Sequence, residues 1–309
     1  MPANHPRAPY EAGLPRLAQR AQPHAHPTAE WREDDWRRYR HAYYALVERA
    51  DQQFGTVLAA VREHRRWSGR ETVVVLTSDH GDGAGAHGWN EKWALFEEVV
   101  RVPFLIGGPG IAAGEVSDRL VSVGEDLLPT LCDLTGVPLP PDLAGPTGPE
   151  GPTDRMGPAS PSPSPSPSLS PLPSPSPSPS PSTGPQLRPQ LRPGLPGRSV
   201  FAPEPRETVV VETRWELPGF EDALGRMIRD QRHKYVCYAW GDHREQLFDL
   251  AEDPGEMVNL AVDARHAALL DRFRALLAEH CAGTGDPFGR FVPERDTPAP
   301  QTTPAPSEG

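Results

Sequence analysis

The chain has few of the residues that build secreted or membrane-bound domains. Its 309 residues include only three cysteines, Cys132, Cys237 and Cys281, and an odd number of widely spaced thiols predicts neither a disulfide framework nor a zinc site. Free thiols are typical of a reducing compartment. No run approaches the roughly 18 apolar residues of a membrane span, and the amino terminus lacks a hydrophobic signal region. We therefore expect a cytoplasmic protein that does not contact a membrane.

Basic and aromatic residues are also scarce. Lys and Arg number 31 against 42 Asp and Glu, which gives a formal net charge of −11, and aromatic side chains make up 7% of the chain. Because phosphate binding requires clustered Lys and Arg, the charge balance argues against a nucleic-acid surface.

Proline (40 residues) and glycine (28 residues) are in excess instead. Ser-Pro repeats dominate residues 146–204, and proline lacks the backbone donor that helices and sheets need, so we expect a solvated, disordered linker there. This linker divides the chain into segments: a flexible lead-in (1–30), a partial α/β domain (31–145), the linker itself (146–204), an α+β subdomain with a closing helix (205–283) and a disordered tail (284–309).

Periodicity predicts the main elements of the α/β segment. Apolar residues at spacings of three and four over 34–64 predict one long amphipathic helix. The short β-branched run from Val73 to Leu76 predicts a buried strand, parallel to its neighbours and covered on both faces. A second buried strand is expected over 102–106.

Shorter elements complete this segment. We expect a short helix over 93–99 and a short strand over 116–123. Asp126 is placed to cap a further helix that stops at Gly136. Strands that alternate with helices predict a parallel or mixed sheet flanked by helices.

The second folded segment has a different pattern. Strands are expected over 208–212 and 226–228, and residues 234–240 and 246–250 predict an antiparallel pair. A closing helix over 263–281 would place Leu269, Phe273 and Leu276 on one face and end at Gly283. The fold class expected for the whole chain is therefore α/β, a partial parallel or mixed sheet followed by a small antiparallel α+β subdomain.

Polar side chains gather where the first predicted strand ends. Thr77, Ser78, Asp79 and His80 follow the strand directly, and His87 and Lys92 lie on the glycine-rich loop beyond it. Ligands of open α/β sheets bind beyond the carboxyl ends of the strands. An acid, imidazoles and a lysine at such an edge predict part of a metal and oxyanion site.

These residues carry a resemblance to a known family. The stretch from Thr77 to Lys92, with FEE at 96–98 and RVPF at 101–104, resembles the second metal-binding motif of the sulfatases, which belong to the alkaline-phosphatase-like superfamily. The similarity continues through DLLPTLCDLTG at 126–136 and from KYVCYAW at 234–240 to the end of REQLFDLAEDPGEMVNLA at 261. Five such elements occur in the order found in the family.

The resemblance implies roles for single residues. Asp79 and His80 match the acid and the histidine or asparagine that bind one divalent cation, commonly calcium and in some members manganese or magnesium. Lys92 matches the lysine that contacts the ester's oxyanion, and its positive charge would stabilise the transferred group. His87 matches a loop histidine that would either donate a hydrogen bond to substrate or orient the loop, and Asp82 reads as a turn residue rather than a ligand.

Part of the family pattern is absent from this sequence. No early hydrophobic strand ends in paired acids, and none of the three cysteines begins the Cys-x-Pro-x-Arg motif that supplies the formylglycine nucleophile. The resemblance therefore implies a carboxy-terminal portion of a metal-dependent sulfuric ester hydrolase that acts on small sulfate esters. Two alternatives stay open: a phosphodiester or phosphonate hydrolase of the same superfamily, and a non-catalytic remnant or subunit that needs a missing amino-terminal half or another copy of the chain.

Overall fold

The computed structural model describes residues 1–5, 28, 30–140, 197–215, 223–239, 243–294 and 297. Most of the expected lead-in, the Ser-Pro-rich linker up to residue 196 and most of the expected tail lie outside the described residues, and the expectations for them stay predictions. Residues 1–136 and 196–309 form one compact unit, which contains every element below. None of the described helices is long and apolar enough to span a membrane.

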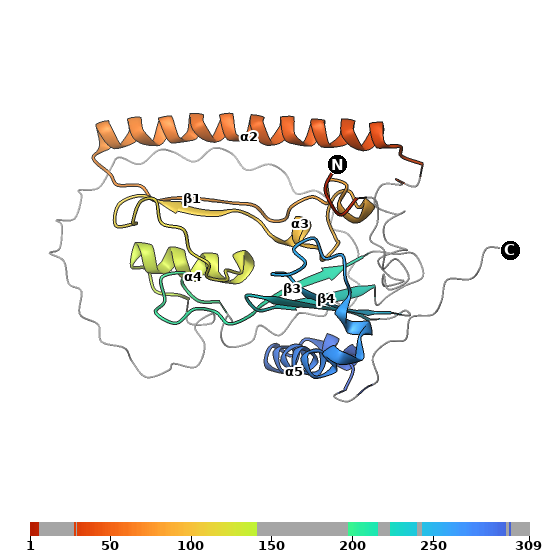
Figure 1. Ribbon diagram of the computed structural model, residues 1–309. Helices are drawn as coiled ribbons and strands as arrows, with labels where there is room; N and C mark the ends of the chain where they lie inside the picture. The colour runs from red at the N-terminus through yellow and green to blue at the C-terminus, as the bar shows by residue number, and fades with distance from the viewer. Residues whose placement is uncertain are drawn as a thin grey trace, which may run out of the picture. The chain divides into compact units, whose positions relative to one another are not determined.

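The long helix expected over 34–64 is α2, Glu33–Ser68 (Figure 1). Three acidic residues occupy its first turn, where negative charge suits the helix dipole. Gly69 ends the helix with a φ of 66°, which glycine adopts without strain. Among its residues only Trp36 is buried, while Val47 and Val57 are 50% and 55% exposed. The helix is confirmed, and most of its apolar stripe is accessible to solvent.

The strand expected at Val73–Leu76 is β1, Val74–Thr77, and its partner is β2, Phe104–Gly107. The two strands pair antiparallel, with Val75 opposite Ile106, so the expected parallel pairing is wrong for this strand. Each residue of β1 is only partly buried. An apolar run indicates that a strand has neighbours on its faces but does not fix the direction of its partner.

The segments between β1 and the next long helix contain less regular structure than expected. Helix α3, Glu97–Val100, overlaps the helix expected over 93–99 only at its last three residues. In place of the strand expected over 116–123, Leu120 makes one isolated bridge to Arg206. Helix α4, Val123–Thr135, stops at Gly136 as expected. Asp126 is not its cap: it lies inside the first turn, buried, and its carboxylate accepts from the backbone N–H of Ser122.

The carboxy-terminal segment forms a four-stranded antiparallel sheet in the order β3-β4-β5-β6 (Figure 1). Its strands are β3 (Val209–Arg214), β4 (Leu224–Arg229), β5 (His233–Tyr238) and β6 (Glu245–Asp249). The expected hairpin is confirmed, with Tyr235 opposite Leu247. Short 3-10 turns complete the described structure: η2 (Ala86–Gly88), η3 (Leu260–Val262), η4 (Ala264–His266) and η5 (Pro287–Phe291).

Both faces of this sheet are covered. Helix α5, Ala267–Thr284, packs on one face through Leu270, Phe273 and Leu277. Of the expected stripe, Phe273 lies in this core, and Leu269 and Leu276 pack against it while partly buried. The helix ends at Gly285 rather than Gly283. The other face packs against residues 89–99, through the side chains Trp89, Ala94, Leu95, Phe96 and Val99. The segment that carries the predicted site thus shares a hydrophobic core with the sheet.

The two boundaries of the carboxy-terminal segment extend further than expected. Residues 197–206 already contact α4, because the Arg206 guanidinium pairs with the buried Asp126 carboxylate. Beyond residue 283, η5 places Phe288 in the core at 0% exposure. The part of the expected tail that precedes residue 293 is therefore ordered structure, because Phe288 fills the space beside α5.

Candidate metal and oxyanion site

Asp79 and His80 directly follow β1 and lie at the surface. The Asp79 side chain is 84% exposed and that of His80 is 40% exposed. The backbone N–H of His80 donates to Asp79 Oδ1 at 2.9 Å, and this hydrogen bond is the main reason that the pKa of Asp79 lies below its usual value. Asp79 is therefore an ionised, oriented carboxylate at neutral pH.

The His80 ring presents an acceptor nitrogen toward the same carboxylate. Its Nδ1 lies 2.7 Å from the carbonyl oxygen of Gly81, and since a carbonyl only accepts, Nδ1 carries the proton of the neutral ring. The lone pair of Nε2 is then available, and Nε2 lies 3.6 Å from Asp79 Oδ2. That separation is close to the spacing of neighbouring ligands around a divalent cation bound at roughly 2.0–2.4 Å. The pair fits two positions of a metal site, and an ion of this class needs at least two more donors.

Gly81 fixes the pair against α3. Its N–H donates to the carbonyl of Val99 at 2.7 Å, and a Cβ at this position would clash with the carbonyl of Glu98. Only glycine permits so close an approach of two backbones. The strand end is thereby held at a fixed distance from the short helix that precedes β2.

The loop of residues 82–93, here called the site loop, is held from the start of α2. Tyr39 donates its hydroxyl to Asp82 Oδ2 at 2.7 Å, and Arg40 donates to the carbonyl of Ala84 at 2.8 Å. Asp82 Oδ1 accepts from the N–H of Ala84, which supports its predicted role in a turn. These contacts connect the only well-buried part of α2 to the predicted site.

The site loop stores backbone strain. Ala84, His87, Glu91 and Trp93 all have positive φ, between 47° and 76°. Residues with side chains are uncommon in this region, and such outliers are found where surrounding structure enforces them, often at functional sites. The strained stretch brackets Lys92.

Lys92 itself is exposed. Its carbonyl accepts from the indole N–H of Trp89 at 2.9 Å, and its ammonium lies 5.7 Å from the ring centroid of Trp93. The buried Trp89 thus anchors the backbone while the side chain stays accessible. No described contact joins Lys92 to Asp79 or His80, so their convergence on one substrate group stays a prediction.

His87 lies in the interior rather than at the surface. It is 6% exposed, its ring stacks on Phe96 at a centroid distance of 3.8 Å, and burial lowers its pKa to about 4. Asn4 contacts it twice, through the backbone and at Nε2. This placement agrees with the interpretation of His87 as a residue that orients the loop, and it disfavours a hydrogen bond from His87 to substrate.

A buried group of charges, which we call the charge network, joins α3 to the sheet. Lys234 of β5, at 0% exposure, lies 2.7 Å from Glu256 and 3.2 Å from Glu97, and Arg229 pairs with Glu97 at 2.7 Å. Glu256 also accepts from the N–H of Glu97 at 2.6 Å. The sequence analysis missed these residues. The only available signal was a lysine at the start of an otherwise apolar strand.

Comparisons with known proteins agree with the geometry. The sequence profile described as Sulfatase matches residues 2–137. A Delta 4,5-hexuronate-2-O-sulfatase of Bacteroides thetaiotaomicron is 30% identical over 279 residues, which cover 89% of this chain and 48% of that protein. The arylsulfatase K of Bos taurus is 29% identical over 76% of this chain and 35% of its own length. This chain belongs to the sulfatase family.

Solved structures share the fold. That of a 2-O GAG sulfatase superposes with a TM-score of 0.62 at 26% identity, covering 96% of this chain and 56% of that one. The phosphonate monoester hydrolase of Agrobacterium radiobacter gives a TM-score of 0.57 at 23% identity, covering 82% of this chain and 43% of that one. The predicted α/β class is confirmed. The chain spans about half the length or less of the two curated relatives above.

Proposed function

We propose that this chain carries one side of a sulfatase-type site, which hydrolyses sulfuric esters with the help of a divalent cation. The observation that carries the proposal is the Asp79–His80 pair at the end of β1, with an ionised carboxylate and an imidazole lone pair 3.6 Å apart. Members of the family generally use a divalent metal. The Asp79 carboxylate offers it a hard oxygen ligand, and the His80 imidazole offers a nitrogen ligand of intermediate softness.

The proposal assigns a role to each of the site residues. Asp79 and His80 would hold the cation, which on binding stabilises negative charge on the ester oxygens. Lys92 would place a positive charge beside the sulfate oxygens as charge develops on the transferred group. Tyr39 and Trp89 fix the loop that carries Lys92. The remaining cation ligands and the nucleophile would come from polypeptide outside these residues, in this chain's continuation or in a partner.

The names of the relatives suggest a substrate class. One acts as a 2-O-sulfatase on unsaturated hexuronates, and a solved relative is a 2-O GAG sulfatase. We propose a sulfated sugar as the substrate of the complete enzyme. Fold similarity to phosphonate monoester hydrolases makes phosphorus esters the natural comparison.

Ligand binding tests the proposal without requiring turnover. In the presence of Ca²⁺, we expect the chain to bind 4-nitrophenyl sulfate more tightly than 4-nitrophenyl phosphate in calorimetric titrations. Lys92→Ala should weaken sulfate-ester binding at least tenfold, and Lys92→Arg, which keeps the charge, should weaken it less. Equal affinity of the parent chain and Lys92→Ala for the sulfate ester would contradict the role of Lys92.

Turnover provides the complementary test. Because the nucleophile is assigned to polypeptide outside these 309 residues, the purified, metal-loaded chain should hydrolyse 4-nitrophenyl sulfate little faster than buffer. Robust hydrolysis that depends on Asp79 would show that the chain contains its own nucleophile and would overturn this part of the proposal.

A further inference from the structure

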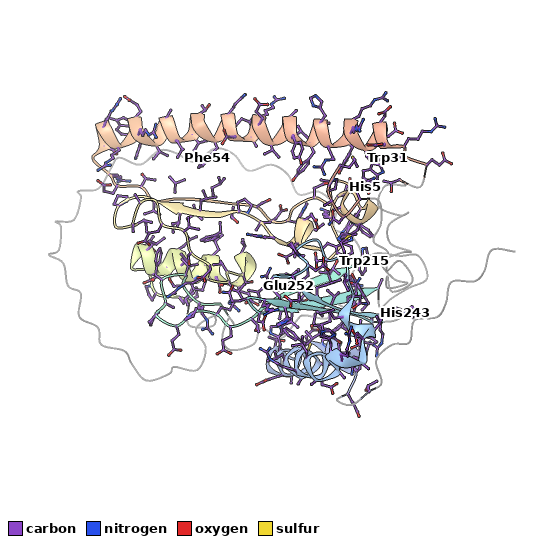
Figure 2. All side chains as sticks on the ribbon, in the orientation of Figure 1. His5, Trp31, Phe54, Trp215, His243 and Glu252 are labelled. Carbon is purple, nitrogen blue, oxygen red and sulfur yellow. The ribbon has the colours of Figure 1, made fainter. Side chains whose placement is uncertain are left out.

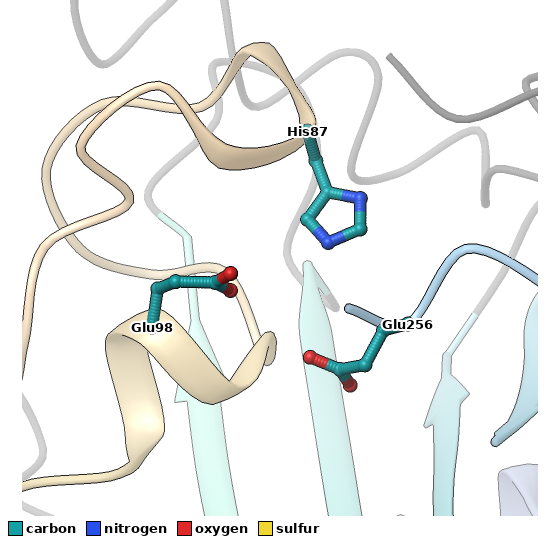
Figure 3. A group of neighbouring side chains, drawn as sticks. All are labelled: His87, Glu98 and Glu256. Atoms are coloured by element: carbon teal, nitrogen blue, oxygen red, sulfur yellow. The ribbon is translucent and has the colours of Figure 1, made fainter. Parts of the chain in front are cut away.

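Three side chains from distant parts of the sequence converge in the interior beside the site loop. Figure 3 shows the ring of His87 and the carboxylates of Glu98 and Glu256 directed toward one common space. One ligand-type atom from each lies within 4.8 Å of the others. His87 and Glu256 are 6% and 1% exposed, and Glu98 is partly buried. We call these three residues the buried cluster.

The amide of Asn4 contacts two members of the buried cluster. Its Nδ2 lies 3.2 Å from His87 Nε2, 2.8 Å from Glu98 Oε1 and 3.2 Å from the carbonyl of Gly255. An amide NH₂ has two hydrogens to donate; Glu98 Oε1 and the Gly255 carbonyl are acceptors for them, whereas the role of His87 Nε2 depends on the tautomer of the ring. The other carboxylate oxygen of Glu98, Oε2, is buried and has no hydrogen-bond partner among the described residues. Glu98 therefore carries a buried acceptor that no donor among the described residues satisfies.

Negatively charged side chains outnumber positively charged ones around the cluster, among the described residues. Three carboxylates, Glu97, Glu98 and Glu256, face two cationic side chains, Lys234 and Arg229. Among the described residues Glu98 makes no ion pair. Buried charges without compensation are costly, and among the described residues Glu98 is the carboxylate of this group for which no cation is seen.

We propose that His87, Glu98 and Glu256 form a binding site for a divalent transition-metal ion of the Zn²⁺ type. One imidazole and two carboxylates are a donor set that suits such an ion. Rotation of the Asn4 amide by half a turn would replace its NH₂ with Oδ1 as a fourth donor, an exchange of atoms that are nearly indistinguishable in shape. This site uses none of the residues Asp79, His80 and Lys92.

The surroundings are suited to hold the ligands in place. Glu256 is oriented by Lys234 and by the N–H of Glu97, and His87 is held by its stack on Phe96. Neighbouring ligands of a tetrahedral Zn²⁺ site lie about 3.4 Å apart, so the three side chains would draw together by roughly 1 Å on binding.

The ion would have a structural role. It would connect the strained site loop through His87 to α3 through Glu98, and to the segment after β6 through Glu256. Removal of the ion is expected to loosen the loop that carries Lys92 while leaving the sheet intact.

Metal titration of a chain without the exposed pair tests the proposal. In the Asp79→Ala/His80→Ala background, stripped of metal by chelator, we expect one Zn²⁺ per chain by calorimetry and elemental analysis. Adding Glu98→Gln should weaken this binding at least tenfold, because glutamine keeps the shape and the acceptor for Asn4 but loses the charge. Glu63→Gln, on the exposed face of α2, is the matched control and should bind like the parent.

Co²⁺ provides a readout that does not depend on the variants. Titration with Co²⁺ should produce visible absorption bands typical of a site with nitrogen and oxygen ligands, and Zn²⁺ should abolish them. If the Asp79→Ala/His80→Ala chain binds no Zn²⁺, or if Glu98→Gln binds it as tightly as its parent, the cluster is a hydrogen-bonded anchor for Asn4 only and the proposal is wrong. Failure of the Asp79–His80 site would leave the Zn²⁺ result unchanged, so the two proposals fail separately.

Discussion

The region that carries the predicted site and the carboxy-terminal sheet differ in how they are supported. In α2 one residue of 36 is buried, and every residue of β1 is only partly buried. In β5, by contrast, five of six residues are buried, and α5 and the segment 89–99 cover the two faces of the sheet. Figure 2 shows side chains crowded around β3, β4 and α5, whereas those of α2 project above and below the helix along its length. The sheet packs against α5 in a hydrophobic core of its own. The site region is buried mainly where residues 89–99 pack against the other face of the sheet.

This difference explains why the site loop is ordered although α2 and β1 are thinly packed. Trp89, Leu95 and Phe96 anchor the loop in the sheet's core, and the charge network holds α3 to β5. The exposed Asp79, His80 and Lys92 are therefore attached to the well-packed region at several points. Substitutions in the two regions should distinguish residues that stabilise the fold from residues that bind the cation or the substrate.

The largest effect is expected when the charge network is broken. Lys234→Met leaves Glu97 and Glu256 buried without their shared cation, and removal of one partner from a buried ion pair costs about 3–5 kcal/mol. Urea denaturation should show this loss in the free energy of unfolding. Glu63→Gln breaks the exposed pair with Arg66 and should leave the free energy of unfolding unchanged within error. Equal stability of the two variants would refute the assigned role of Lys234.

Truncation of one apolar side chain in each region should lower the free energy of unfolding by unequal amounts. Phe273→Ala in α5 removes a side chain with 0% exposure and should cost about 3–5 kcal/mol in urea denaturation. Val57→Ala in α2 removes a side chain that is 55% exposed and should cost well under 1 kcal/mol. A large loss for Val57→Ala would show that α2 is covered in solution, for instance by another polypeptide.

The buried His87 should make stability depend on pH. Its pKa is lowered to about 4 in the folded chain from 6.5 in the unfolded one, mainly by burial. Its contribution to stability is therefore complete above pH 6.5 and is lost as the pH falls toward 4. The stability difference between the parent chain and His87→Asn should be largest above pH 6.5 and shrink by up to about 3 kcal/mol at pH 4. A difference that does not vary with pH would show that His87 is not buried in its neutral form.

Thiol reactivity should distinguish the regions without altering the chain. Cys132 in α4 is partly exposed, whereas Cys237 and Cys281 are buried, and burial raises their pKa values to about 12 and about 11. In native buffer one thiol per chain should react quickly with a disulfide reagent, and three should react in denaturant. Rapid reaction of Cys281 in native buffer would indicate that α5 separates readily from the sheet.

The sequence predicted the elements that depend on local pattern. Helix α2, the β5–β6 hairpin and the strand that ends at Asp79 follow from spacing and residue type alone. The antiparallel pairing of β1 with β2 could not be predicted, because strand direction is fixed by contacts outside the strand.

The buried polar residues were also beyond the sequence pattern. His87 is buried by Asn4, which lies 83 positions earlier, and Glu256 meets Glu97 across 159 positions. Lysine is seldom fully buried, so the residue type of Lys234 gave no indication that it lies in the interior. Contacts between such distant residues leave no period in the sequence.

The most direct test of the account is whether Asp79 holds a cation. In the Glu98→Gln chain, where the buried cluster is disabled, calorimetric titration with Ca²⁺ should show one weak site per chain. Adding Asp79→Ala should lower the affinity at least tenfold, with the folded structure checked by circular dichroism. Unchanged Ca²⁺ affinity in a correctly folded Asp79→Ala chain would contradict the assignment of the strand end as one side of a sulfatase-type metal site.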